Sequence, residues 1–259
     1  MKVPFYWIDA FTGRRFGGNP AGVVITDAEL PVEAMQSIAN ENNVPETAFV
    51  VPAGEDFRIR WFSPTVEVDL CGHATLASAC ALRLAGRVSK DTVRFHSKSG
   101  PLAVTRDGNR FALDFPARRG ERIAADDAIR AALGVTPEEV YRAPAMMAVL
   151  PSEQALRDLK PRIDLVVKQP GYGFVVTAPG KDCDFVSRFF APQVGIDEDH
   201  ATGSTHCQLI PYWSERLSKK KLHARQLSVR GGEFWCEDRG ERVTIAGECA
   251  VYISGQIEI

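Results

Sequence analysis

The 259-residue sequence lacks the features that mark several large classes of protein. No apolar run approaches the roughly 20 residues of a membrane-spanning helix. Asp9 interrupts the first residues before the apolar core of a signal peptide can form. The formal net charge is only −2, so no strong basic field attracts nucleic acid or an acidic membrane. We therefore expect a cytoplasmic protein that has neither nucleic acid nor membrane as a partner.

The signatures of common cofactor sites are missing as well. Neither GxGxxG nor GxxxxGK[ST] occurs, so no nucleotide cofactor is indicated, and no GxSxG marks a hydrolase. The six cysteines include no CxxC pair and are expected to be reduced. His200, His206 and Cys207 do not match the spacing of a standard zinc site. We expect neither a metal nor an organic cofactor.

What the sequence does contain is an internal repeat. Residues 60–64 (RWFSP) match residues 188–192 (RFFAP), which lie 128 positions later (188 − 60). A glycine turn follows each copy, at Gly72 and at Gly203. A helical segment comes next, and then an alternating strand–turn–strand pattern over 101–115 and 232–246. Matched elements in the same order indicate two structurally related halves.

These patterns predict an α+β fold of two pseudo-symmetric halves, each a mostly antiparallel or mixed sheet wrapped around a central helix. The first half is expected over 1–115, with the C-terminal strand, about 249–259, as a candidate to return to it. The second half is expected over 116–248, with 116–125 as a polar joint. Helices are predicted over 31–43, 74–86 and 204–217, the last kinked by Pro211.

Two of the predicted helices begin at the glycine turns, and this suggests a binding site. A helix N-terminus offers unpaired N–H groups and a partial positive charge, which suit a carboxylate. If the halves face each other, both helix starts point into one cleft and hold a small anionic substrate there. His73 follows the first glycine, and Asp199 and Ser204 flank the second.

Glu46 completes a set of groups that can move protons. It opens the apolar strand 47–51 (TAFVV), where partial desolvation raises the pKa of a carboxyl group and makes it a useful base. A glutamate, a histidine and an aspartate can together remove and return a proton. The sequence shows no obvious nucleophile beside them.

Several segments taken together resemble one known family. They are Asp9–Thr12 with Gly18–Gly22, Glu46–Phe49, Leu70–Thr75, and Phe190–Pro192 continuing through Glu198–Asp199 to Ala201–Ser204. The chain resembles the phenazine-biosynthesis-like (PhzF) isomerases over essentially its full length. The resemblance implies the diaminopimelate-epimerase-like fold, an isomerase that shifts a proton without a cofactor, and a homodimer. The phenazine enzyme itself isomerises trans-2,3-dihydro-3-hydroxyanthranilate.

The resemblance also implies roles for individual residues. The catalytic glutamate of the family falls on Glu46, and its partners fall on His73, Asp199 and Ser204. The residues expected to bind substrate are Asn19, Cys71, Gly72, Thr202, Gly203 and Ser204. One departure is His200, which stands where the family commonly has proline after the aspartate.

Two alternatives remain open at this level. The fold is shared with epimerases that use two facing cysteines, and Cys71 stands at the first of these places. The second half offers Asp199, Thr202 and Ser204 instead, which disfavours a symmetric two-thiol mechanism but leaves a racemase or epimerase that uses Cys71. The other alternative is a non-catalytic binding protein on the same fold. The sequence does not identify the substrate.

Overall fold

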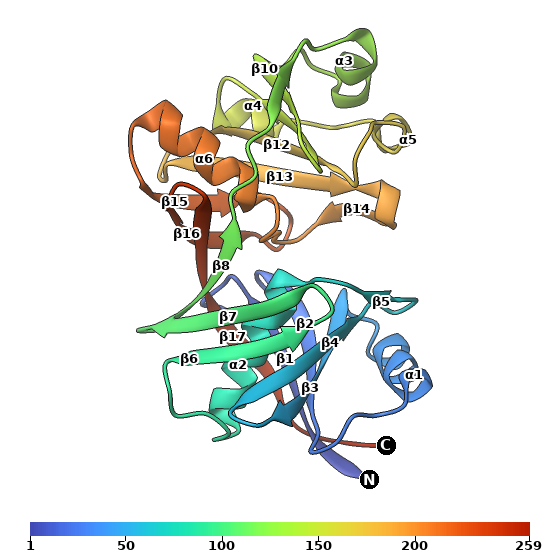
Figure 1. Ribbon diagram of the computed structural model, residues 1–259. Coiled ribbons are helices and arrows are strands. Elements are labelled where there is room, and N and C mark those ends of the chain that lie inside the picture. Colours follow the sequence, from blue (N-terminus) through green and yellow to red (C-terminus); the bar gives the residue numbers. More distant parts are fainter. The chain divides into compact units, whose positions relative to one another are not determined.

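The computed structural model describes residues 1–259 and divides the chain into two compact units. Unit 1 comprises Met1–Asp114 together with Ala246–Ile259, and unit 2 comprises Phe115–Ile245. The C-terminal segment therefore belongs to unit 1. Both units combine many strands with few helices, which confirms the predicted α+β class (Figure 1).

Unit 1 is a closed sheet around one helix. Its pairings run β17–β1–β2–β3–β4–β6–β7–β8, and β8 pairs with β17 again. The two-residue β5 adds to β4. The strands are β1 (Lys2–Ala10), β2 (Asn19–Ile25), β3 (Glu46–Ala53), β4 (Asp56–Phe62), β5 (Glu67–Val68), β6 (Thr92–Ser97), β7 (Gly100–Asp107), β8 (Arg110–Pro116) and β17 (Arg242–Glu258).

Helix α2 (Gly72–Leu84) contacts β1, β2, β3 and β7 and is buried along all but its last residues. Its sequence, GHATLASACALRL, is rich in alanine, so the helix is both favourable and narrow enough for strands to pack on every side. Helix α1 (Val32–Asn42) lies outside the strands, beside β3 and β4 (Figure 1). None of the helices of the chain reaches the length and apolar character that crossing a membrane demands.

Unit 2 repeats this pattern of pairing in the order β9–β10–β11–β12–β13–β15–β16, with β14 added to β13. Trp213 of its main helix is fully buried, stacks on Phe185 and donates to Thr177 Oγ1 at 2.9 Å. The elements are β9 (Glu121–Ile123), α3 (Asp127–Leu133), β10 (Glu139–Arg142), β11 (Met146–Val149), α4 (Glu153–Arg157), α5 (Ile163–Val166), β12 (Phe174–Pro179), β13 (Phe185–Ala191), the 3₁₀ helix η1 (Pro192–Val194), β14 (Ile196–Asp199), α6 (His206–Leu217), β15 (Lys221–Gln226) and β16 (Gly232–Asp238).

The predicted pseudo-symmetry is confirmed and extends further than the sequence match. In unit 1, β1–β2 is antiparallel, β2–β3 parallel, β3–β4 antiparallel, and β4–β6 parallel across α2. In unit 2, β10–β11, β11–β12, β12–β13 and β13–β15 follow the same directions, the last across α6. The repeat thus begins with β1 and β10, well before the matching residues 60–64 and 188–192.

Two features of unit 2 differ from the prediction. The helix expected from residue 204 begins at His206, because residues 203–205 form a tighter turn in which His206 N donates to Gly203 O and Cys207 N to Ser204 O. The segment 116–125, expected as a joint, contains β9, which pairs with β10. The segment is polar because β9 is the end strand in this pairing order, and the edge of such a strand stays in contact with water.

Each unit carries the same ion pair just before its glycine turn. In unit 1, Arg60 of β4 binds both oxygens of Glu67 in β5, at 2.8 and 2.9 Å. In unit 2, Arg188 of β13 binds both oxygens of Glu198 in β14 at the same distances. Each guanidinium also lies over the phenylalanine two residues later, at 5.4 Å and 4.9 Å from the ring centre. The repeated RWF and RFF sequences therefore have one structural role.

The first of these pairs predicts an acid-sensitive contribution to stability. The Arg60 guanidinium holds the pKa of Glu67 at about 2, below its ordinary value of 4.5. Glu67→Gln is expected to lower the free energy of unfolding at pH 7 by about 1–2 kcal/mol. Because the folded pKa is depressed, this difference is present above pH 4.5 and shrinks as the pH falls from about 4.5 towards about 2.

Urea unfolding of the wild type and the variant at several pH values between 7 and 3 measures this difference. The exposed Glu55→Gln is the matched control and should change the free energy of unfolding by less than about 0.5 kcal/mol. A difference between wild type and Glu67→Gln that stays constant over this pH range would contradict the assignment.

Candidate active site

Glu46 is the first residue of β3 and lies opposite Ala21 of the parallel strand β2. The side chain is 17% exposed, whereas Ala48, Phe49 and Val50 of the same strand are buried. The strand is fixed by its pairing on both sides, so the position of the carboxylate is fixed as well. The partial desolvation expected from the sequence is present.

His73 and Cys71 lie against this carboxylate. His73 Nε2 is 3.2 Å from Glu46 Oε2, and Cys71 Sγ is 3.5 Å from His73 Nδ1. Both side chains are buried, with 8% and 6% of their surface exposed. The imidazole ring thus stands between a carboxylate and a thiol. The structure brings together three of the residues singled out in the first half of the sequence.

The start of α2 fixes these side chains. Cys71 is the N-cap residue in an extended conformation, and its carbonyl accepts from Thr75 N at 3.1 Å and from Thr75 Oγ1 at 2.5 Å. No side chain caps the helix, and its first turn, which begins at Gly72, holds no acidic residue. The positive end of the helix dipole is therefore not offset by a carboxylate of its own first turn, which favours an anionic ligand.

Asn19 is fully buried at the start of β2, two residues before the partner of Glu46. It follows Gly18, whose φ is +57°, and a Cβ at Gly18 would lie 2.0 Å from the carbonyl oxygen of Ala10. Only glycine fits that position, so the turn delivers Asn19 into the strand that neighbours β3. The structure places Asn19 in the same sheet as Glu46.

In unit 2, Asp199 ends β14 and faces its own turn. Asp199 Oδ2 accepts from Thr202 Oγ1 at 2.5 Å, and Asp199 Oδ1 accepts from the N–H of His200 at 2.9 Å. Thr202 and Gly203 are buried, whereas Ser204 is exposed. The Ser204 hydroxyl lies 3.3 Å from the hydroxyl of Tyr172, and burial raises the pKa of that tyrosine. Tyr172 carries no motif and was not predicted from the sequence.

Gln226, the last residue of β15, holds this turn in shape. Its Oε1 accepts from Thr202 N at 2.9 Å, and its Nε2 donates to Asp199 O at 2.8 Å and to Thr202 Oγ1 at 3.1 Å. The side chain is 1% exposed. Sequence reasoning missed it because it lies 24 positions after Thr202. The available signal was a glutamine on the inward side of an alternating strand, where Leu222 and Ala224 are also buried.

His206 supports the same turn from the start of α6. Its Nδ1–H donates to Thr202 O at 2.9 Å, and its ring stacks on Phe234 at 3.9 Å between centres. Burial lowers the pKa of His206 to about 4, so the ring is neutral at neutral pH. Its contacts are those of a residue that positions the turn.

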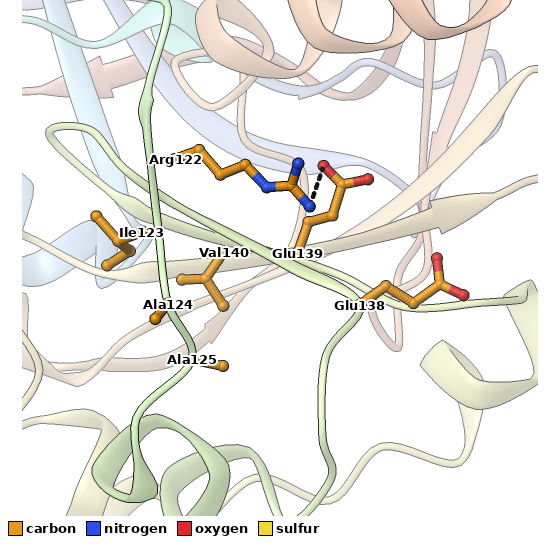
Figure 2. A pocket seen from close by; sticks show the side chains of 7 residues that line it. All are labelled: Arg122, Ile123, Ala124, Ala125, Glu138, Glu139 and Val140. Atoms are coloured by element: carbon orange, nitrogen blue, oxygen red, sulfur yellow. Dashed lines mark ion pairs between the residues drawn. The ribbon is translucent and has the colours of Figure 1, made fainter.

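A pocket of about 380 Å³ lies elsewhere on unit 2 (Figure 2). Arg122 and Glu139 point toward one another across it at 4.0 Å, and Glu139 also accepts from Arg216 Nη1 at 2.6 Å. These charges offset each other, and no predicted site residue lines the pocket. The lining residues are Arg122, Ile123, Ala124, Ala125, Glu138, Glu139 and Val140. The candidate site therefore stays at the two glycine turns.

The contacts of Gln226 predict a measurable loss of stability. Gln226→Ala leaves Thr202 N and Asp199 O without their buried partner, and we expect a loss of about 2–4 kcal/mol in the free energy of unfolding. Urea denaturation measures this loss. Gln154→Ala is the matched control, because that amide binds only Asp158 on the surface. Equal effects of the two substitutions would show that Gln226 does not hold the turn.

Comparison with known proteins shows the family to which the chain is related. The model of the phenazine biosynthesis-like proteins (PhzC-PhzF) matches residues 8–255. An uncharacterised isomerase of Pseudomonas aeruginosa is 48% identical over 260 residues, which cover 100% of both chains. The human phenazine biosynthesis-like domain-containing protein is 37% identical over 286 residues, covering 99% of both.

Solved structures agree with the sequence relatives. The crystal structure of a PhzF-family protein of Enterococcus faecalis has a TM-score of 0.98 at 43% identity, and the match covers 100% of both chains. A predicted epimerase of Pseudomonas aeruginosa, at 20% identity, shares the fold with a TM-score of 0.73 over 98% of this chain. The chain therefore belongs to the phenazine biosynthesis-like (PhzF) family, and it is an isomerase.

Proposed function

We propose that this isomerase shifts a proton on a small carboxylated substrate, with Glu46 as the general acid and base. The observation that carries the proposal is the 3.2 Å contact between Glu46 Oε2 and His73 Nε2 at the start of α2. A carboxylate beside a helix N-terminus and a histidine can remove a proton from carbon and return it. The nearby helix start supplies positive potential for the negative charge that develops on the substrate.

Each group has a defined part in the proposed reaction. The Glu46 carboxylate takes a proton from one carbon of the substrate and, as the carboxylic acid, delivers it to another. His73 Nε2–H donates to Glu46, which orients the carboxylate and stabilises its ionised form between turnovers. Cys71 faces the other ring nitrogen and holds the ring in place. Every proton lost by the substrate returns to it, so the reaction consumes no co-reactant.

The remaining residues are assigned to substrate binding. At the start of α2 the backbone at Gly72 is proposed to bind a carboxylate of the substrate, and Asn19, at the start of β2, is also assigned to substrate binding. In unit 2 the turn formed by Thr202, Gly203 and Ser204 is proposed to bind a polar group of the substrate, and Asp199 holds Thr202 in position. A homodimeric state and a cytoplasmic location stay predictions.

The assigned role of Glu46 predicts a loss of proton exchange when its carboxylate is removed. Thermal-shift screening of small carboxylates, including dihydro-hydroxyanthranilate and amino and hydroxy acids, identifies a ligand that raises the melting temperature. NMR then follows exchange of its carbon-bound proton in D₂O. Glu46→Gln is expected to slow this exchange by roughly 10²–10⁴-fold, since the amide cannot accept the proton. The exposed Glu41→Gln on α1 is the control. Full exchange in Glu46→Gln would falsify the assigned role.

A second candidate function rests on one observation, the 3.5 Å contact between Cys71 Sγ and His73 Nδ1. Such a pair could activate the thiol as the base of a racemase or epimerase. The two functions are separated by Cys71→Ser. If Glu46 is the base, Cys71→Ser slows the exchange by less than about tenfold, because the thiol only orients the imidazole ring. A Cys71 racemase would lose nearly all of its rate in Cys71→Ser and keep it in Glu46→Gln.

The role of Ser204 predicts a change in KM. Removing its hydroxyl in Ser204→Ala is expected to raise KM by about three- to tenfold with little change in kcat, as for the loss of one hydrogen bond to bound substrate. Steady-state kinetics on the ligand found above measure both constants. Ser37→Ala, on the exposed face of α1, serves as the control. An unchanged KM would remove Ser204 from the binding site.

A further inference from the structure

The three side chains at the start of α2 have a second chemical property. Glu46, Cys71 and His73 each offer one ligand atom, and these atoms all lie within 4.8 Å of one another. A carboxylate oxygen, an imidazole nitrogen and a thiolate sulfur are the three donors that zinc uses in proteins. Cys71 and His73 are buried, and all three residues belong to unit 1.

The nitrogen and oxygen are spaced as a zinc ion requires, and the sulfur is within reach of the same ion. Bonds of about 2.3 Å to sulfur and about 2.0–2.1 Å to nitrogen and oxygen, at tetrahedral angles, separate S from N by about 3.5 Å and N from O by about 3.3 Å. Cys71 Sγ lies 4.0 Å from His73 Nε2, and that nitrogen lies 3.2 Å from Glu46 Oε2. The same sulfur lies 3.5 Å from Nδ1, so it stands over the face of the ring, and another rotamer of Cys71 must bring it to an ion bound by Nε2.

The backbone segments that carry the ligands are held by the surrounding structure. Thr75 binds the Cys71 carbonyl with its N–H and its hydroxyl, and Glu46 starts a strand that is paired with β2 and β4. When Nε2 binds the metal ion, the proton of the imidazole ring moves to Nδ1. Ligands on fixed elements lose little freedom when the ion binds, which favours affinity.

We propose that Glu46, Cys71 and His73 form a binding site for Zn²⁺ and that the ion inhibits the enzyme. The ion takes the lone pair with which Glu46 receives the substrate proton, so an occupied site cannot start the reaction. Three protein donors leave a fourth position open for water or a substrate carboxylate. The inhibitory part rests on the proposed function; the binding part does not.

Binding has a defined proton balance. In the free site the Cys71 S–H and the His73 Nε2–H carry one proton each. In the occupied site the thiolate and Nε2 bind the ion, Nδ1 carries one of these protons, and the other enters solvent. Zinc binding therefore releases one proton for each ion. Mg²⁺ prefers oxygen ligands and is not expected to bind.

Cobalt(II) gives a readout that does not depend on activity. Chelator-treated protein titrated with Co²⁺ should develop a thiolate-to-metal charge-transfer band in the near ultraviolet and the visible bands of a four-coordinate ion, saturating at one equivalent. Zn²⁺ should displace the cobalt and raise the melting temperature. Cys71→Ser should abolish the charge-transfer band, and Cys183→Ser, in unit 2, should keep it. Mg²⁺ is the control ion.

Each outcome of the cobalt and zinc experiments supports or overturns the proposal. Absence of the band in the wild type, or its persistence in Cys71→Ser, overturns the site. If Cys71→Ser does not fold, Cys71→Ala and Glu46→Gln test the same point, and each should weaken zinc binding at least tenfold. Zinc that binds without slowing turnover overturns the inhibition alone. Full turnover in Glu46→Gln overturns the proposed function while leaving the cobalt spectrum of the wild type unchanged.

Discussion

Arginine–glutamate pairs placed before each glycine turn hold the segments on which the candidate site depends. Arg60 and Arg188 each bind both oxygens of a glutamate on the neighbouring strand. Such a two-point contact fixes orientation as well as distance, which a single lysine contact does not. Glu67 is five residues before Gly72, and Glu198 is the residue before Asp199. The pairs therefore set the path by which the chain enters each turn.

The packing of the central helix α2 determines the site in unit 1. Because α2 is buried nearly all round, it has no freedom to rotate, and its first residues have none either. Cys71 and His73 are consequently held against Glu46 at the end of a paired strand. The second turn depends more on hydrogen bonds: Gln226, His206 and Asp199 together satisfy the polar groups of Thr202. Packing fixes the first turn, and a buried polar network fixes the second.

This difference explains which features could be predicted from the sequence. Glu46, His73 and Cys71 were accessible as candidate residues because they sit in recognisable segments, one at a strand start and two at a helix start. The two halves were visible because the arginine and glycine positions repeat. Gln226 and Tyr172 were not accessible, since their contacts with Thr202 and Ser204 join residues 24 and 32 positions apart without a shared motif. The upstream part of the repeat was also hidden, because pairing directions can be kept while sequences diverge.

The two turns also differ in chemical capacity, although their backbones correspond. At the first turn, a carboxylate from β3 lies beside an imidazole and a thiol from the start of α2, with one ligand atom of each within 4.8 Å of the others. At the second turn, the Asp199 carboxylate accepts from the Thr202 hydroxyl and the His200 N–H, and the buried His206 donates to a carbonyl. Closely spaced groups of these types suit proton transfer, and they are also the types that bind a divalent cation such as zinc. Corresponding turns of the pseudo-symmetric fold thus carry different chemistry: the turn of unit 1 gathers titratable groups, and the turn of unit 2 is a hydrogen-bonded network around Thr202.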